Sequence, residues 1–321
     1  MKRERLPRWF VALALVLLLA VPPVQAASAK STATKKTSTG SKRATSPKRV
    51  ARNPYLGAVV VEAASGRVLF EEGADAHGYP ASMLKLMDLL IILEKIERRE
   101  LSFQDQVKIS AKAARTGGSQ VWLAEKEVFS VDDLLYALMV QSANDAAVAL
   151  AEKVAGSTDA FIQLMNQRAQ ALGMTNTIFR SVHGLPPSAG QQPDVTTPRD
   201  FVKLCREVLR HRDTLRYTGT RVRSFREKVP GKTVVMRNHN HLLGKLEGCD
   251  GLKTGYISAA GYSVAVTAAR DGHRVITVVF DCVDRNVRDA KATDLTKRAL
   301  ALWTPVARPG TAPAQPKAAA R

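Results

Sequence analysis

The sequence has few cysteines and no pattern that would hold a metal ion. Its three cysteines, Cys205, Cys249 and Cys282, allow at most one internal disulfide and leave at least one free thiol. No combination of Cys and His has the spacing of zinc ligands, and His239 and His241, a lone His pair, are expected to be loop or hydrogen-bonding residues. We therefore expect neither a metal site nor a cofactor.

The chain also lacks a hydrophobic run long enough to cross a membrane comfortably. Its N-terminal apolar run, 10–21, is shorter than the about 20 residues that a spanning helix needs. Four basic residues precede this run, and Val24-Gln25-Ala26 supplies small residues at cleavage spacing, so we predict a secretory signal over 1–26. The protein is then exported, to the periplasm, the extracytoplasmic face or the cell wall. An uncleaved membrane anchor is the alternative.

Acidic residues are missing from both flanks of the chain. Residues 27–53 carry a charge of +8 and the tail from 305 to 321 carries +3, with no acid in either, while the whole chain carries +19. The signal adds +3, so only +5 belongs to residues 54–304. We predict that 27–53 is a flexible tether for an anionic wall or membrane surface and that 305–321 is a disordered Pro/Ala-rich tail. The export signal argues against nucleic acid as a partner.

Residues 54–304 have the composition and mixed pattern of one folded domain. With 45% hydrophobic residues, the 321-residue chain is not disordered throughout. A hairpin over 56–62 and 67–70 precedes helices expected over 82–98, 131–140, 145–154, 157–173 and 197–212. Strands follow at 220–225, 232–237, 251–257, 262–269 and 274–281, and a helix over 287–302 closes the domain. This order predicts an α+β domain, with an antiparallel sheet covered by helices and a helical subdomain.

Three short motifs carry the chemistry. Ser82 and Lys85 of Ser82-Met83-Leu84-Lys85 fall on one face at the start of the first long helix, near unpaired backbone N–H groups. Ser142-Ala143-Asn144 lies between two helical segments, and Lys253-Thr254-Gly255 lies on a strand. Taken singly, each is equally consistent with an ordinary structural role: a capping Ser and a solvated Lys, a break between helices, or a strand weakened by Gly.

Their order and spacing are more informative. Ser-x-x-Lys, Ser-x-Asn and Lys-Thr-Gly follow one another at intervals of 60 and 111 residues, a set typical of β-lactamases and penicillin-binding proteins. Over about 53–302 the chain resembles the low-molecular-mass D-alanyl-D-alanine carboxypeptidases, the serine peptidases that trim peptidoglycan stem peptides. The resemblance extends to the stretches 80–81, 144–146, 182–185, 197–200 and 250–256. Members of that family often have Thr where Asp88 stands.

The resemblance implies a fold, a substrate and a class of inhibitor. The fold is β-lactamase/transpeptidase-like: a five-stranded antiparallel sheet flanked by helices, with an all-helical subdomain. The substrates would be peptidoglycan stem peptides, and β-lactams would be covalent inhibitors.

Acyl transfer assigns the nucleophile, its base and a proton relay to three of these residues. Ser82 attacks the carbonyl between two D-alanines and forms an acyl-enzyme. Lys85 is the base, which requires its pKa to fall by roughly 3 units, through burial and the charge of Lys253. Ser142 relays a proton to the leaving amine.

The other motif residues would bind the substrate. Asn144 orients the substrate peptide, and Lys253 and Thr254 hold its terminal carboxylate. Gly255 lets the substrate backbone approach the strand. The oxyanion hole of the family consists of the backbone N–H groups of Ser82 and Tyr256.

Three other functions use the same features. A β-lactamase of class A has a Glu-x-x-Leu-Asn pattern between the second and third motifs, and Glu152, Glu207, Glu227 and Glu247 all lack this context. A DD-endopeptidase that cuts peptidoglycan cross-links would use the same residues on a longer leaving group. A catalytically inactive wall-binding protein would need only the basic tether. The carboxypeptidase is the function that we predict.

Overall fold

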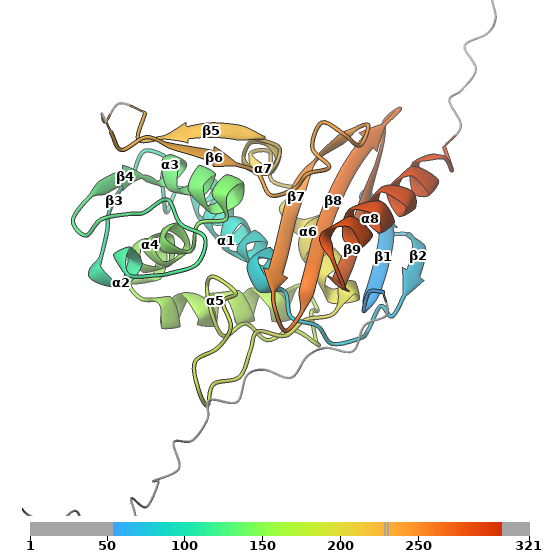
Figure 1. Ribbon diagram of the computed structural model, residues 1–321, viewed down its shortest axis with the longest axis horizontal. Helices are drawn as coiled ribbons and strands as arrows, with labels where there is room; N and C mark the ends of the chain where they lie inside the picture. The colour runs from blue at the N-terminus through green and yellow to red at the C-terminus, as the bar shows by residue number, and fades with distance from the viewer. Residues whose placement is uncertain (1–53, 228, 230, 304–321) are drawn as a thin grey trace, which may run out of the picture. The chain divides into compact units, whose positions relative to one another are not determined.

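An antiparallel sheet of five strands, in the order β2-β1-β9-β8-β7, forms the centre of the domain (Figure 1). The computed structural model describes residues 54–303 except 228 and 230. The predicted signal, tether and tail lie outside the described residues. The strands of the sheet are β1 (Gly57–Glu62), β2 (Val68–Glu72), β7 (Cys249–Ile257), β8 (Gly261–Arg270) and β9 (His273–Cys282).

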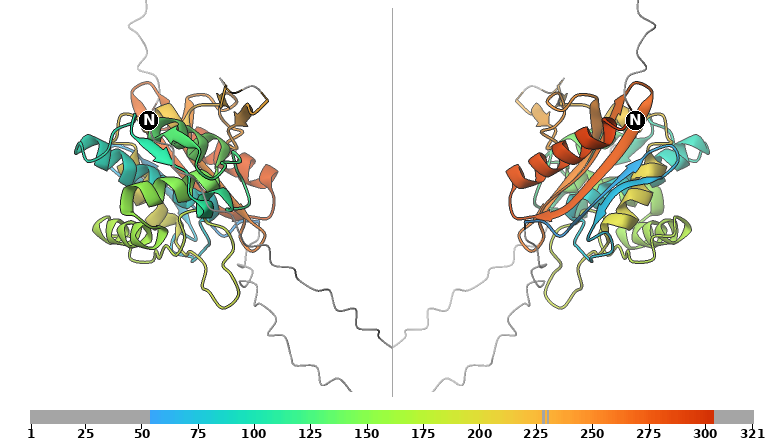
Figure 2. Two further views of the ribbon diagram at one scale, coloured as in Figure 1. Left: turned by 90° about the vertical axis from the view of Figure 1, so that its left-hand side faces the viewer. Right: turned by 90° about the vertical axis from the view of Figure 1, so that its right-hand side faces the viewer.

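Helices cover both faces of this sheet. α8 (Arg285–Leu300) packs on one face against β8 and β9, and α6 (Pro198–Val208) packs on the other against β1 and β9 (Figure 2). Successive residues of β1 therefore enter different cores: Val59 packs with the helical part and Val60 packs under α8. Because both faces are buried, β1 reads as a continuous apolar run instead of an alternating one.

The remaining helices lie beside the sheet and form a second part of the domain (Figure 1). Its long helices are α1 (Lys85–Glu97), α4 (Asn144–Ala155) and α5 (Thr158–Ala171). Two short strand pairs, which join neither each other nor the main sheet, border it: β3 (Gln106–Lys108) with β4 (Val128–Ser130), and β5 (Val222–Phe225) with β6 (Val234–Arg237). Shorter helices complete it: η1 (Ala81–Leu84), α2 (Ala111–Ala114), α3 (Val131–Tyr136), η2 (Ala137–Gln141) and α7 (Thr214–Thr218).

The predicted fold class, hairpin, meander and closing helix are confirmed, and three details differ. The helix expected over 197–212 ends at Val208, whose carbonyl accepts a hydrogen bond from the Thr214 hydroxyl as the chain turns into α7. The helix expected from Ser82 begins as the 3₁₀ turn η1. The helix expected over 131–140 widens into the π-helical turn η2.

Neither a disulfide nor a long apolar helix is present in the part of the chain that the structure describes. Cys205, Cys249 and Cys282 are all free thiols. Across residues 54–303, apart from 228 and 230, no helix is long and apolar enough to cross a membrane.

Candidate active site

The three motifs meet where strand β7 runs beside the start of the first helix. Gly255 of β7 lies so close to η1 that a Cβ atom there would be 2.5 Å from the carbonyl oxygen of Pro80. The absence of a side chain at Gly255 therefore lets the strand approach η1, which carries Ser82, in addition to the role with substrate expected from the sequence.

Ser82 and Lys85 lie one helical turn apart, as their spacing predicts. The Nζ atom of Lys85 lies 2.8 Å from the Oγ atom of Ser82, and the lysine side chain is completely buried. Burial lowers the pKa of Lys85 to about 7, although the nearby carboxyl groups of Asp88, Asp145 and Asp194 oppose this effect. An amine with this pKa is neutral in a large fraction of molecules near pH 7, and its lone pair can accept the Ser82 proton.

Asn144 and the loop at His183 fix the position of the Lys85 amine. Lys85 Nζ donates to Asn144 Oδ1 at 2.7 Å and to the carbonyl oxygen of His183 at 3.0 Å. The amide nitrogen of Asn144 donates to the carbonyl of Gly117 at 2.8 Å. Both ends of the Asn144 side chain are thus bound by protein groups instead of facing the cavity.

Ser142 and Lys253 form a second pair across the site. Lys253 Nζ lies 3.0 Å from Ser142 Oγ, and both residues are 2% exposed. Burial, followed by the charge of Lys85, holds the pKa of Lys253 well below its usual value. The charge of Lys85 therefore disfavours protonation of Lys253, whereas burial is the cause that lowers the pKa of Lys85.

Two residues of the site region have a left-handed backbone that is unusual for side chains with a Cβ atom. Ala81, directly before the nucleophile, has φ of 46°, and Ser142 has φ of 60°. Each such conformation costs of order 1–3 kcal/mol and persists because the surrounding structure enforces it. In this domain, packing holds Ser82 and Ser142 in place: Ala81, the neighbour of Ser82, lies against the loop at Gly184, and Ser142 ends η2.

A cavity of about 440 Å³ opens over these residues and contains members of all three motifs. Tyr256, whose side chain is 53% exposed, stands at its edge with its ring 4.4 Å from that of Tyr262. The motif residues in its wall are Ser82, Ser142, Thr254 and Gly255, joined by Ser119, His239, His241, Tyr256, Tyr262, Arg285 and Arg288.

Arg285 and Arg288 are residues of this cavity that the sequence analysis did not identify. Arg288 is 3% exposed, and its Nη2 atom has no hydrogen-bond acceptor among the described residues, although it lies 2.7 Å from an oxygen of Asp289. Arg288 is thus paired with Asp289 while it lines the cavity, and a guanidinium in a cavity wall can bind a carboxylate. A signal was present in the sequence, two arginines one turn apart at the start of the closing helix, but only the fold brings this turn to Ser82.

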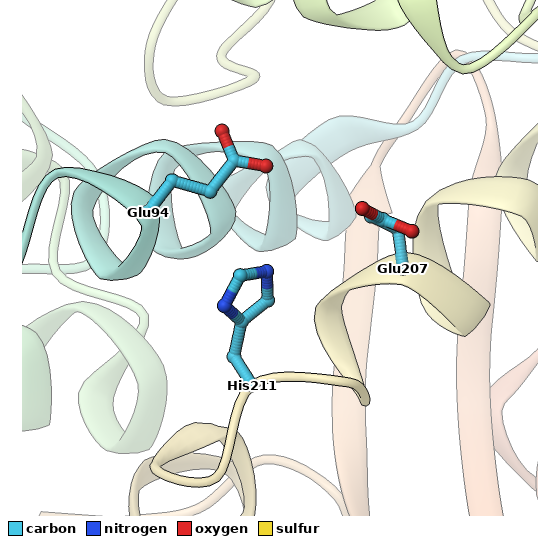
Figure 3. Close-up of side chains that lie close together, drawn as sticks. All are labelled: Glu94, Glu207 and His211. Carbon is cyan, nitrogen blue, oxygen red and sulfur yellow. The ribbon is translucent and has the colours of Figure 1, made fainter. Parts of the chain in front are cut away.

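Three ligand-type side chains gather elsewhere in the domain, at the far end of α1. Atoms of Glu94, Glu207 and His211 lie within 4.8 Å of one another (Figure 3). The guanidinium of Arg168 lies 2.6 Å from each of the two carboxylates, and His211 Nδ1 lies 2.7 Å from Glu97. Because Arg168 already neutralises the carboxylates, we interpret the group as an ion-pair network that joins α1, α5 and α6.

Comparison with known proteins identifies relatives that are named D-alanyl-D-alanine carboxypeptidases. A family model described as D-alanyl-D-alanine carboxypeptidase matches residues 43–284. The chain is 33% identical to D-alanyl-D-alanine carboxypeptidase DacF of Bacillus subtilis over 238 residues, which are 74% of this chain and 60% of that protein. It is 34% identical to DacC of Escherichia coli over 237 residues, 72% of this chain and 57% of that protein. The chain thus spans less than two thirds of the length of these two relatives.

Solved structures agree with this result. Penicillin-binding protein D2 of Listeria monocytogenes, in its ampicillin-bound form, is 31% identical and matches with a TM-score of 0.67 over 77% of this chain and 97% of its own. The carboxypeptidase DacD of Francisella tularensis, at 29% identity, matches with a TM-score of 0.70 over 81% of this chain and 73% of its own. With the family match over most of its length, the chain belongs to the D-alanyl-D-alanine carboxypeptidase family.

Proposed function

We propose that the protein is a serine-type D-Ala-D-Ala carboxypeptidase that trims peptidoglycan stem pentapeptides through an acyl-enzyme on Ser82. The observation that carries this proposal is the buried Lys85 amine, 2.8 Å from Ser82 Oγ and with a pKa of about 7. No other basic side chain is this close to the Ser82 hydroxyl in the described part of the chain. Lys85 is therefore the base for the attack of Ser82 on the carbonyl carbon.

The backbone supplies the groups that stabilise the tetrahedral intermediate. β7 is an edge strand of the sheet, so some of its N–H groups face away from β8. The N–H groups of Ser82 and Tyr256 are the proposed oxyanion hole. Losing one such donor typically costs about 10²–10³ in rate.

The second half of the cavity accommodates the leaving D-alanine. Ser142, bound to Lys253, passes a proton to the leaving amine as the peptide C–N bond breaks. Thr254, Lys253 and Arg288 receive the terminal carboxylate, and Arg288, which lines the cavity, is the contact that adds to the sequence prediction. Asn144 acts as a positioning residue for Lys85, because its amide is already bound on both sides.

The same nucleophile should react with β-lactams, as the ampicillin-bound structure of the Listeria relative suggests by similarity. Labelling of the full chain with a fluorescent penicillin is the first test. A covalent adduct that is absent from the Ser82→Ala variant is expected. Release of free D-alanine from a pentapeptide ending in D-Ala-D-Ala, measured by chromatography, is the second. Intact protein that gives neither adduct nor D-alanine would refute the proposal.

We also propose that the protein acts outside the cytoplasm. The basis is the predicted signal over 1–26, together with the substrate of the family, peptidoglycan. The basic residues of 27–53 then hold the domain near an anionic wall or membrane surface.

A further inference from the structure

In the proposed reaction, the Lys85 amine becomes an ammonium when it takes the proton of Ser82. Its Nζ atom lies 2.8 Å from Ser82 Oγ, 2.7 Å from Asn144 Oδ1 and 3.0 Å from the carbonyl oxygen of His183. All three partners are uncharged groups, and the lysine side chain is completely buried. A buried ammonium without a counter-charge is costly, so a carboxyl group that does not touch Nζ has to balance it.

Three buried carboxyl groups act on the Lys85 amine from a distance. Each raises the pKa of Lys85, and they are, in order of decreasing effect, Asp88 of α1, Asp145 of α4 and Asp194 of the segment before α6. Asp145 accepts hydrogen bonds from three backbone N–H groups. Asp194 accepts two from backbone N–H groups and one from the Ser181 hydroxyl. The charges of Asp145 and Asp194 are therefore stabilised by hydrogen bonds that do not involve Lys85.

Asp88 has no such support. Its side chain is 1% exposed, and neither of its carboxyl oxygens has a hydrogen-bond partner among the described residues. It lies in the first turn of α1, three residues after Lys85, so the two side chains share one face of the helix. Most buried polar groups in proteins are hydrogen-bonded, so a buried carboxyl group without a partner calls for a functional explanation. Lys85 supplies the cation that can stabilise its charge.

The titration of Asp88 is coupled to that of Lys85. Burial raises the pKa of Asp88 well above its usual value, the charge of Lys85 lowers it, and Asp194 raises it further. The other titratable groups near Lys85 cannot balance its charge. Burial, followed by the charge of Lys85, lowers the pKa of His183 to about 4, and Lys253 is itself a base. Asp88 and Lys85 therefore form a coupled pair in which each charge favours the other.

We propose that Asp88 is a positioning residue that acts through Lys85: its carboxylate is the counter-charge of the ammonium that forms when Ser82 attacks. This inference rests on the proposed function and adds a residue to it. In the attack, the Ser82 proton moves to Lys85 Nζ while Oγ bonds to the carbonyl carbon. Asp88 forms no bond and takes up no proton in this step; it lowers the energy of the ammonium. Members of the family often have Thr at this position, so the counter-charge distinguishes this chain from them.

Two neutral replacements of different shape, Asp88→Asn and Asp88→Thr, test the proposal through the pH profile of penicillin acylation. Without the carboxylate, Lys85 should lose its proton at lower pH. Since a nearby opposite charge typically shifts a pKa by about 1–3 units, the midpoint of the acidic limb should fall by at least about one pH unit in both variants. The plateau rate should fall about three- to tenfold, because a less basic amine accepts the Ser82 proton less readily.

These two effects make the pH profiles of the variants and of the wild type cross. At about pH 9 both variants should be slower than the wild type, whereas at about pH 5 they should be at least as fast, since a larger fraction of their Lys85 is neutral there. Damage to the fold would slow acylation at every pH. Asp271→Asn, which removes a carboxylate from the exposed turn between β8 and β9, is the matched control and should leave midpoint and plateau unchanged.

Titration of Lys85 by NMR, in protein with isotope-labelled lysine side chains, separates this inference from the proposed function because it needs no substrate. The Lys85 signal is assigned by its absence from Lys85→Gln, and its pKa should be lower in both Asp88 variants than in the wild type. If the acylation midpoint or the Lys85 pKa failed to fall in one of the two variants, the inference would be wrong. A wild-type protein that gives no penicillin adduct would instead refute the proposed function, and the NMR titration would still decide whether Asp88 is the counter-charge of Lys85.

Discussion

At the scale of the residue, the protonation state of Lys85 should control the rate of acylation. Lys85 must be neutral to accept the Ser82 proton, and burial lowers its pKa to about 7. The penicillin acylation rate should therefore rise between pH 5 and pH 8 and be about 100-fold lower at pH 5 than on its plateau. Stopped-flow labelling with a fluorescent penicillin measures this rate across the pH range. A flat profile, or a rise that begins only above pH 9, would contradict the assignment.

Asp88, three residues after Lys85, is a buried carboxyl group with no hydrogen-bond partner among the described residues. Burial raises its pKa well above the usual value, although the charge of Lys85 opposes this effect. Because the folded pKa lies above the unfolded one, Asp88 lowers stability increasingly as pH rises above about 4. Asp88→Asn should therefore raise the melting temperature at pH 8, by about 2–4 °C, and change it little at pH 4.

Glu125→Gln, at an exposed position, is the control for Asp88→Asn. It should give no pH-dependent difference in the melting temperature. The Asp88 interpretation would be wrong if Asp88→Asn lowered the melting temperature at pH 8 or shifted it equally at both pH values.

Single-residue chemistry could be predicted from the sequence only where a motif marks it. Ser82, Lys85, Ser142 and Lys253 belong to spaced motifs; the structure places Lys85 beside Ser82, as their spacing predicts, and Lys253 beside Ser142. Arg288 has no motif: its role depends on where the first turn of α8 lies relative to β7, which a pattern along the chain does not encode.

At the scale of the element, the loop before Leu185 controls how Ser82 and Lys85 are presented. Gly184 has φ of 76°, and a Cβ atom there would be 2.2 Å from the carbonyl oxygen of Ala81. Gly184→Ala should therefore push the loop away from η1 and remove the contact of the His183 carbonyl with Lys85. We expect penicillin acylation to fall at least tenfold and the melting temperature to fall by several degrees.

Gly190→Ala is a matched control for this prediction. Gly190 has φ of 82°, so an alanine there meets the same backbone penalty, but nothing lies within 4 Å of its Cβ position. It should lower stability slightly, by about 1–2 kcal/mol, and leave the acylation rate unchanged. Equal losses of activity in the two variants would show that backbone strain, and not the contact with Ala81, explains the effect.

The sequence predicts the elements that are long enough to show a clear periodicity, and it misses the short ones. The meander β7–β8–β9 consists of long apolar strands joined by turns, so its pattern is strong. β3 and β4 have three residues each, too few for a period to show. The end of α6 at Val208 depends on a hydrogen bond from Thr214, a tertiary effect that helical periodicity across 197–212 does not reveal.

At the scale of the domain, the site lies where the helical part meets the sheet. Ser82 and Lys85 belong to the helical part, while Lys253 and Thr254 belong to β7 of the sheet. The sequence predicts both parts, because each has its own periodicity. It does not predict that Arg285 and Arg288 of α8 line the same cavity as Ser82, because they are distant from Ser82 along the chain.

The separation between the domain and its charged flanks leads to the last prediction. All motif residues lie between 82 and 255, whereas residues 27–53 carry +8 without an acid. Replacing the eight basic residues of 27–53 with Gln keeps the length of the proposed tether and removes its charge. Since each Lys or Arg near an anionic surface contributes about 1 kcal/mol, binding to vesicles with anionic lipid or to isolated wall should fall at least tenfold at low salt. High salt should weaken the surface binding of the unmodified protein in the same way.

Penicillin acylation by the charge-free variant in solution should stay within about twofold of that by the unmodified protein. The tether contributes no motif residue, and long-range charge is screened beyond about 10 Å. Cosedimentation measures the first effect and labelling the second. Equal sedimentation of the two proteins would refute the proposed role of 27–53 in surface binding. A large loss of acylation would show that these residues act on the active site itself.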